Sequence, residues 1–322
     1  MRSSQIILPF IFSTVLLFSS CAPTARAPTP TPQPVTLRIA ALRILDTLPM
    51  YVADQRGYFS ARGIQVEFLP VASAPERDQL IASGQADGMI NEMTSVLFSN
   101  RSQITIQVVR FARAASKDQP VFKILAGKES SLNALKDLQK VQTGISQGTI
   151  IEYLFERIIQ AEGYAVKDFP TINIPSVADR TSLLQSGELK AAILPDPFSD
   201  LAEQNGAVRI IDDSSHPEYG YSVLSFRKAF IDQNPSAIQA FLAAWEKAVE
   251  EVNFDPSQWK DLLTQRQLVP APILGSYQVP TYVTAAVPSE QQFLDALEWA
   301  KSKDLLTQDQ AYKDCVNASF LP

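Results

Sequence analysis

The sequence predicts an α/β protein with two similar lobes, each a mostly parallel sheet flanked by helices, and a helical C-terminal tail. Two observations support this prediction. Short apolar segments alternate along the chain with amphipathic ones, which is the pattern of parallel strands covered by helices. In addition, "LIASGQADGMI" (80–90) and "LLQSGELKAAI" (183–193) align without gaps at an offset of 103 residues, so one helix-glycine-strand unit occurs in both halves.

Residues 36–112 are expected to form the first part of lobe 1. Strands are expected in the runs of Ile, Val and Leu, and helices where apolar residues recur three or four positions apart. The expected order is strand 36–42, helix 48–59, strand 63–71, helix 74–84, strand 86–90 and strand 104–112.

Residues 121–211 are expected to form lobe 2. Its clearest element is a helix at 148–163, because the apolar residues there recur at i, i+3, i+4, i+7 and i+8 and so share one face. That face consists of Ile151, Leu154, Phe155, Ile158 and Ile159. The other expected elements are strands 121–127, 141–146, 171–175, 191–195 and 208–213, and helices 178–187 and 197–207.

Two polar segments are expected to connect the lobes. Residues 113–120 ("RAASKDQP") leave lobe 1, and residues 212–220 ("DDSSHPEYG") lead back to it. Residues 221–322 then complete lobe 1 and add long helices, the first of which starts with Asn234 as N-cap and Pro235 after it. Two lobes joined in this way leave a cleft, and ligands bind beyond the carboxyl ends of strands in such sheets.

The N-terminal residues predict export. Residues 1–20 carry one charged side chain and an apolar run at 6–18, which is too short to span a bilayer and stop there. Cys21 follows small residues, as in the signals of bacterial lipoproteins, although Phe18 stands where Leu is usual. We therefore expect an exported protein with a lipid anchor on Cys21, located at the outer face of the cell membrane or in the periplasm.

The alternative is an ordinary signal peptide cut near Ala22 or Ala25. In either case residues 21–35 are rich in Pro and Thr and cannot bury an apolar face, so they predict an extended tether. A polyproline-like chain of this length reaches roughly 40 Å.

The composition excludes several functions. The chain carries a formal net charge of −6 and no cluster of Lys and Arg, which argues against nucleic acid as a partner. One histidine, with cysteines at 21 and 315, cannot assemble a zinc site of the usual kind. We expect no metal, no cofactor, a monomer, and no redox role for Cys315.

Five blocks follow one another in a characteristic order and spacing: "DTLPMYVADQRGYFSARGIQVEF", "ERDQLIASGQADGM", "TGISQGTIIEYLFERIIQAEG", "DRTSLLQSGELKAAILPDPFSDLAEQNGA" and "NPSAIQAFLAAWEKAVEE". Over residues 36–255 they resemble the substrate-binding proteins of ABC importers in the nitrate, sulfonate and thiamine-precursor group. The resemblance implies the type II periplasmic-binding-protein fold, a ligand held between hinged lobes, and delivery to a membrane permease with its ATPase.

The resemblance also implies where the ligand is held. Binding residues of the group follow the first strand, follow "GQADG", occupy the "S-x-G-T" helix start and include the "DP" motif. Aromatic side chains, including Tyr153 and Phe198, could stack on a heteroaromatic ligand or belong to the core. The predicted ligand-binding residues are Asp46, Thr47, Leu48, Tyr51, Asn91, Glu92, Thr94, Ser146, Gln147, Gly148, Thr149, Asp196 and Tyr221.

Two ligand chemistries fit these residues. Asp46, Glu92 and Asp196 could form an acidic pocket for an ammonium or aminopyrimidine group, or could simply cap and stiffen local turns. Free N–H groups of Gly148 and Thr149, beside the Ser146 hydroxyl, suit a sulfonate, nitrate or phosphate. We expect a vitamin-precursor-like amino or heteroaromatic compound first and a sulfonate or nitrate second, captured by hinge closure without catalysis.

A secreted serine hydrolase is the alternative function. "GISQG" (144–148) fits the G-x-S-x-G motif between a strand and a helix, and Ser146, Asp196 and His216 follow the hydrolase order. No HGGG-type oxyanion segment precedes the motif, and glycine suits tight turns for other reasons. The binding-protein interpretation is therefore preferred.

Overall fold

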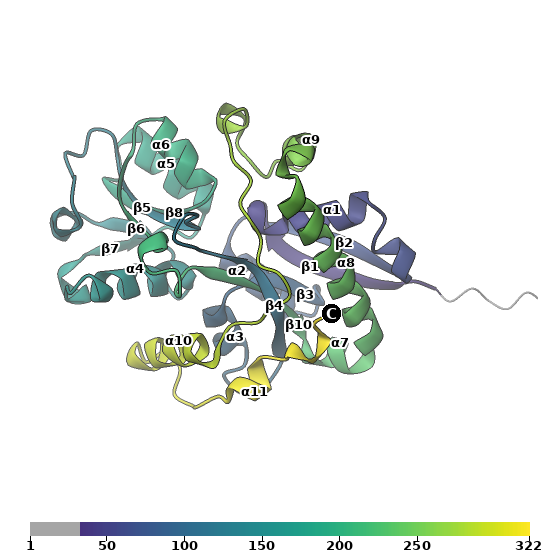
Figure 1. Cartoon of the computed structure of the whole chain (residues 1–322). Helices are drawn as coiled ribbons and strands as arrows, with labels where there is room; N and C mark the ends of the chain where they lie inside the picture. Colours follow the sequence, from purple (N-terminus) through teal and green to yellow (C-terminus); the bar gives the residue numbers. More distant parts are fainter. Residues whose placement is uncertain (1–32) are drawn as a thin grey trace, which may run out of the picture. The chain divides into compact units, whose positions relative to one another are not determined.

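A computed structural model describes residues 33–322, and the predicted α/β fold class is confirmed in it: two separate five-stranded sheets are flanked by helices (Figure 1). The predicted signal segment 1–20, the lipidation site Cys21 and most of the predicted tether lie outside the described residues. Within the described range, no helix has both the length and the apolar character needed to cross a bilayer.

The first sheet has the strand order β2-β1-β3-β10-β4. β1 pairs in parallel with β2 and β3, whereas β10 pairs antiparallel with β3 and β4, so β10 is the one reversed strand of this sheet. The strands are β1 (Val35–Leu42), β2 (Ile64–Val71), β3 (Gly88–Asn91), β4 (Ile106–Ala114) and β10 (Tyr221–Arg227).

The second sheet has the order β7-β6-β8-β5-β9 and repeats the first one strand for strand, with β5 reversed where β10 is reversed. We call the two sheets, each with the helices that cover it, the first and the second lobe. The strands of the second lobe are β5 (Phe122–Ala126), β6 (Thr143–Ile145), β7 (Thr171–Asn173), β8 (Ala191–Pro195) and β9 (Val208–Asp212).

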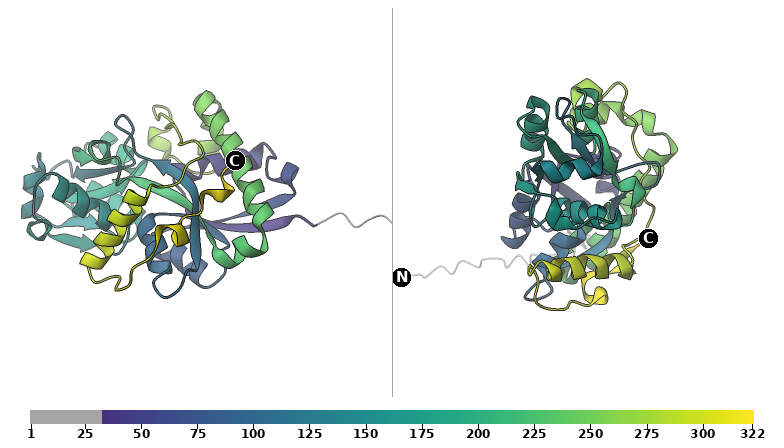
Figure 2. Two further views of the ribbon diagram at one scale, coloured as in Figure 1. Left: turned by 60° about the horizontal axis from the view of Figure 1, so that its bottom comes forward. Right: turned by 90° about the vertical axis from the view of Figure 1, so that its left-hand side faces the viewer.

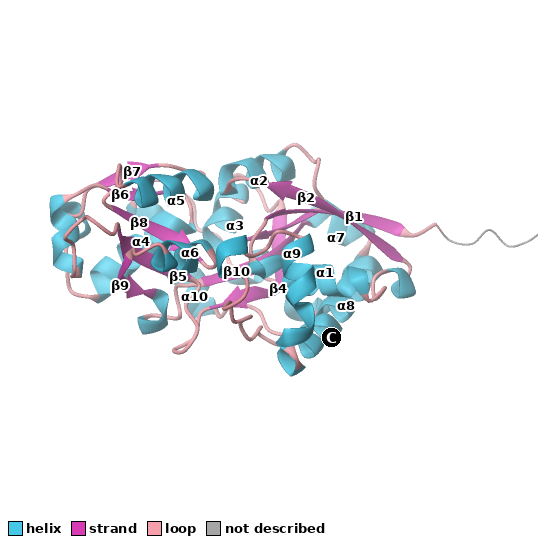
Figure 3. Ribbon diagram, turned by 90° about the horizontal axis from the view of Figure 1, so that it is seen from above, coloured by secondary structure: helices cyan, strands magenta, loops and turns pink. Residues whose placement is uncertain are grey.

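Helices cover both sheets (Figure 3). The helix expected at 48–59 ends at Gln55, because Gly57 turns the chain with a φ of +69°. The helices are α1 (Leu48–Gln55), α2 (Ala74–Ala82), α3 (Met93–Ser99), α4 (Ile150–Ala161), α5 (Val177–Ser186), α6 (Phe198–Gln204), α7 (Lys228–Gln233), α8 (Pro235–Phe254), α9 (Lys260–Gln265), α10 (Glu290–Ser302) and α11 (Tyr312–Cys315).

The core follows the sequence pattern closely in α4, whose predicted apolar face is buried. In the first lobe the long helix α8 contributes a second apolar face around Phe241, Trp245 and Val249, all fully buried. This face packs against α1 and the first sheet. Burial of these faces, more than helix propensity, determines where the helices lie.

Helix α10 packs against both lobes. Its Asp295 accepts hydrogen bonds from Tyr153 Oη (2.6 Å) and Arg157 Nε (2.9 Å) of α4. The ring of its Trp299 lies 5.5 Å from that of Tyr153 and 6.5 Å from that of Phe98 in α3, between centroids. Figure 2 shows this yellow helix alongside both the teal second lobe and the blue part of the first. One apolar cluster therefore continues from the first lobe to the second.

Candidate ligand-binding site

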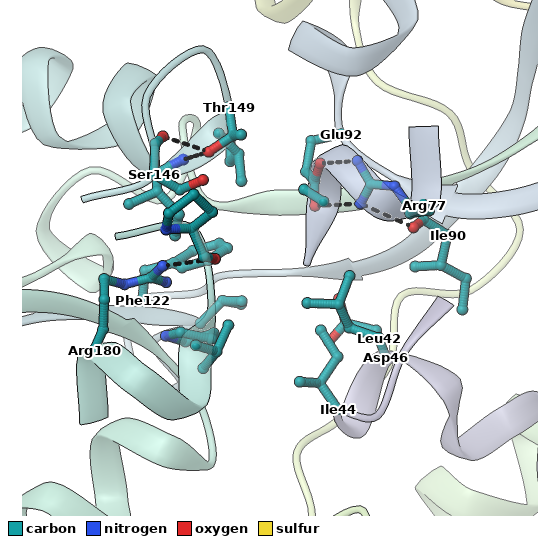
Figure 4. Close-up of a pocket in the computed structure, with 17 residues that line it drawn as sticks. Leu42, Ile44, Asp46, Arg77, Ile90, Glu92, Phe122, Ser146, Thr149 and Arg180 are labelled. Carbon is teal, nitrogen blue, oxygen red and sulfur yellow. Dashed lines mark hydrogen bonds and ion pairs between the residues drawn. The ribbon is translucent and has the colours of Figure 1, made fainter. Parts of the chain in front are cut away.

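A cavity lies where the strands of the two sheets end, with walls from both lobes (Figure 4). The space within it that the centre of a water molecule can reach is about 40 Å³, so the two walls lie close together. Most of its lining is apolar, and the charged side chains in it come from α2, α5 and the loops after β1 and β3. The lining residues are Leu42, Ile44, Asp46, Ala74, Arg77, Ile90, Glu92, Val121, Phe122, Ser146, Thr149, Ile150, Ile151, Pro175, Val177, Arg180 and Pro195.

Four of the predicted ligand-binding residues line this cavity: Asp46 and Glu92 from the first lobe, and Ser146 and Thr149 from the second. The others are placed elsewhere. Tyr51 packs on Phe68, with 4.6 Å between ring centroids, and under the Arg266 guanidinium. Buried positions outside the lining are occupied by Thr47, Leu48, Asn91, Thr94, Asp196 and Tyr221, and Gln147 is exposed.

The two aspartates of the predicted acidic pocket are bridged by an arginine. Arg113, at the end of β4, donates from Nη2 to Asp196 Oδ2 at 2.6 Å, and its Nη1 lies 3.7 Å from Asp46 Oδ1. Tyr277 Oη also donates to Asp196, and Ser222 Oγ donates to Asp46 Oδ2 at 2.6 Å. All three charged side chains are nearly inaccessible to solvent. Arg113 thus supplies the positive charge that the sequence interpretation assigned to a ligand.

Glu92 is paired in the same way. Arg77 of α2 donates to both of its carboxylate oxygens, at 3.1 and 3.0 Å, and to Asp78 at 2.9 Å. Burial disfavours the charge of Arg77, but Asp78 and Glu92 outweigh this and raise the pKa of the guanidinium above its ordinary value. Glu92 is therefore ion-paired without a ligand, although Arg77 shares its single charge between Glu92 and Asp78.

The start of α4 does not offer all the free N–H groups that were expected. Gly148 N–H donates to the Glu152 carboxylate at 2.7 Å, and Gln147 N–H donates to Asn173 Oδ1 at 3.0 Å. The Thr149 hydroxyl caps the helix by accepting from Ile151 N–H at 3.2 Å. Because a carboxylate of the helix itself is bound at this end, the expectation of a free Gly148 N–H is wrong.

Sequence reasoning missed two buried arginines that face the cavity from opposite lobes. Arg77 in α2 and Arg180 in α5 are separated by the repeat offset of 103 residues. Each reaches the carbonyl of the equivalent strand residue: Arg77 Nη1 donates to Ile90 O at 3.1 Å and Arg180 Nε to Ile193 O at 3.2 Å. The internal alignment, extended upstream by three positions, would have found the pair.

The alternative prediction of a hydrolase triad is wrong. His216 Nε2 contacts Glu162 Oε1 at 2.9 Å, at the C-terminal end of α4, whereas Ser146 precedes the N-terminal end of that helix. A helix of this length separates its ends by roughly 18 Å. Asp196 is bound to Arg113 and does not contact His216. The three residues therefore cannot relay a proton.

Two further residues that the sequence analysis named, Tyr221 and Cys315, are buried. The Tyr221 ring meets Phe111 edge-on at 5.5 Å, and burial raises the pKa of Tyr221 above its ordinary value. Cys315 is buried and forms no disulfide within the described part of the chain. Across residues 33–322, no group of three or more His, Cys, Asp or Glu side chains is placed to hold a metal ion.

Comparison with known proteins identifies relatives that bind small solutes. An Escherichia coli (strain K12) protein provisionally assigned to aliphatic-sulfonate binding is 26% identical over 155 residues, about half (48%) of either chain. The formylaminopyrimidine-binding protein of Halalkalibacterium halodurans is 20% identical over 224 residues, 68% of this chain and 66% of that protein. The crystal structure of the periplasmic aliphatic sulphonate binding protein SsuA from Escherichia coli matches with a TM-score of 0.71, at 20% identity, over 85% of this chain and 94% of that one.

The family model described as NMT1/THI5 like matches residues 45–259, which include nine of the ten strands in whole or in part and most of the cavity lining. Because this match covers more than half of the sequence and the solved relatives share the two-sheet architecture, the chain belongs to the NMT1/THI5-like family and has the fold of the type II periplasmic-binding proteins.

Proposed function

We propose that this protein is the solute-binding component of an ABC importer, which captures a small organic compound between its lobes and delivers it to a membrane permease. The observation that carries the proposal is the cavity beyond the strand ends, which takes its lining from both lobes. A ligand that contacts both walls stabilises the closed arrangement over an open one, so binding and closure are coupled.

The lining of the cavity favours a ligand with an oxyanion head on an apolar body. The sequence alone instead predicts an amino or heteroaromatic compound first. Asp46 and Glu92, which line it, already have cationic partners in Arg113 and Arg77, which they share with Asp196 and Asp78. Leu42, Ile44 and other apolar side chains provide a surface for a hydrocarbon or aromatic body. Sulfonates therefore rank first among the candidates, and aminopyrimidines second.

The location belongs to the same proposal. A protein that delivers a ligand to a permease must stay near the outer face of the membrane. A lipid on Cys21, followed by an extended tether at 21–35, would keep it there. The proposed protein acts as a monomer. Metabolic labelling with a radioactive fatty acid tests the anchor: the wild type should incorporate label, and Cys21→Ser should not.

The test of capture uses calorimetry on the purified full-length protein with alkanesulfonates, benzenesulfonate, nitrate and aminopyrimidines. A micromolar dissociation constant, about 8 kcal/mol, is expected for at least one compound. Ala74→Trp should abolish that binding, because Ala74 lines the cavity at the first turn of α2. The matched control is Ala82→Trp, an exposed position at the other end of the same helix.

Small-angle scattering with and without the bound compound tests closure. The radius of gyration should fall on binding to the wild type and stay constant with Ala74→Trp. Saturable binding that survives Ala74→Trp would place the ligand outside this cavity and contradict the proposal.

A further inference from the structure

We infer that Arg180 is the residue that selects the ligand, by binding its oxyanion head on the wall of the second lobe. The inference rests on the proposed function, because it assigns the chemistry of the same cavity. It comes from a comparison of the two halves of the molecule, which place an arginine at the same point of the fold but in different electrostatic surroundings.

The two arginines are structurally equivalent. Each lies in the first turns of a helix whose N-cap serine, Ser73 in α2 and Ser176 in α5, accepts a hydrogen bond from a backbone N–H of the first turn. The serines are again 103 residues apart. Both arginine side chains are buried and line the cavity, Arg77 from one side and Arg180 from the other (Figure 4).

Their charges are balanced differently. Arg77 has two carboxylates, whereas the equivalent positions beside Arg180 hold Thr181 in place of Asp78 and Pro195 in place of Glu92. Arg180 is held by carbonyls alone: Nε by Ile193 O at 3.2 Å, and Nη1 by Ile174 O at 2.7 Å and Pro175 O at 3.0 Å.

This leaves Arg180 as a cation without a counterion. Among the described residues its guanidinium forms no ion pair, and Nη2 donates to no protein acceptor. Burial lowers the pKa of Arg180 to about 10, so the group remains charged at neutral pH. A buried charge is costly unless it is paired, and an oxyanion in the cavity would pair it with a charge-assisted hydrogen bond.

The surroundings define the rest of the ligand. Ser146 and Thr149 lie on the same wall as Arg180, and Leu42, Ile44 and Asp46 lie on the opposite wall (Figure 4). The Gly148 N–H at the start of α4 already donates to the Glu152 carboxylate, so this end of the helix does not compete with Arg180 for the anion. An organic sulfonate or carboxylate would therefore place its head against the second lobe and its apolar body against the first.

The experiment measures the affinities of benzenesulfonate, of its uncharged analogue benzenesulfonamide, and of benzylamine by calorimetry on the full-length protein. The wild type should bind benzenesulfonate about 10- to 100-fold more tightly than the sulfonamide. This ratio corresponds to the free energy that a hydrogen bond to a charged group contributes. Arg180→Gln should remove this preference. Lys167→Gln, which removes an exposed charge from the same lobe, should keep it.

Arg180→Gln also loses bonds to three carbonyls and could unfold, so a second pair of variants keeps the arginine. Thr181→Asp supplies the carboxylate that Asp78 gives to Arg77, and Thr181→Asn has the same size without the charge. Only Thr181→Asp should lose the preference for benzenesulfonate, and both should melt cooperatively.

The outcomes separate the inference from the proposed function. Tight binding of benzenesulfonate that Thr181→Asp leaves unchanged overturns the role of Arg180 but keeps capture in the cavity. Preferential binding of benzylamine that is lost in Ala74→Trp overturns the oxyanion preference and again keeps capture. If no member of the sulfonate and pyrimidine panels binds, both proposals fail.

Discussion

Removal of the Arg113 charge should destabilise the protein strongly, because it leaves two buried carboxylates without a positively charged partner. The substitution Arg113→Met keeps most of the side-chain volume. Asp46 and Asp196 have side-chain exposures of 3% and 6%, so water cannot replace the lost charge. At separations of 3.7 and 2.6 Å, the gross attractions are about 4 and 6 kcal/mol at an effective dielectric constant of about 20.

Desolvation offsets much of this attraction, so the expected loss of unfolding free energy is about 3–5 kcal/mol. For a domain of this size that corresponds to a fall in melting temperature of roughly 10 °C. Urea unfolding followed by circular dichroism measures the loss. Arg113→Lys, which keeps the charge but cannot reach both carboxylates with one planar group, should lose less.

The pH dependence distinguishes lost charge pairing from lost packing. In Arg113→Met the two buried carboxylates should have raised pKa values in the folded state, so their cost is absent at low pH and grows as pH rises. The difference from the wild type should therefore be smaller at pH 5 than at pH 8. The double variant Arg113→Met/Asp196→Asn should recover part of the loss at pH 8. A loss under 1 kcal/mol, or one that is independent of pH, would refute the reasoning.

Two further predictions concern the sheets and the connection between the lobes. Gly88→Ala should cost about 1–3 kcal/mol in a urea titration, because a Cβ there would lie 2.5 Å from Phe226 Cδ1, whereas Gly275→Ala, which meets no atom within 4 Å, should cost little. Equal losses in the two variants would contradict this. Burial raises the pKa of Asp213 to about 7, although it accepts hydrogen bonds from the N–H groups of Val121 and Phe122. Because the folded state then holds a proton that the unfolded state has released, the wild type should lose up to about 1.4 kcal/mol per pH unit relative to Asp213→Asn as pH rises from 4 to 7. Parallel stability curves for the two proteins would show that Asp213 titrates normally.

Local and repeated features of the fold were predictable from the sequence. The apolar face of α4 was correct residue by residue, because helix periodicity depends only on neighbours along the chain. The repeat indicated two similar lobes, and the two sheets do share one strand order. The reversal of β5 and β10 was not predictable, since each follows a connection whose path depends on the packed lobes.

The candidate site was predictable only in part. Asp46 and Glu92 were correctly placed at strand ends, but their arginine partners come from distant segments, and no local pattern joins residue 46 to residue 113. The sequence shows Asp78 beside Arg77 and Thr181 beside Arg180. This difference bears on ligand binding only because both arginines line one cavity, which the sequence does not show.

The position of Trp299 makes its intrinsic fluorescence sensitive to the arrangement of the two lobes. Its indole lies between a ring of α3 and a ring of α4, whereas the other two tryptophans of the chain, Trp245 and Trp259, pack inside the first lobe. A rotation of one lobe against the other should therefore change the surroundings of this indole more than those of Trp245 and Trp259. A shift in emission that disappears in Trp299→Phe would thus record the motion directly, without any attached dye.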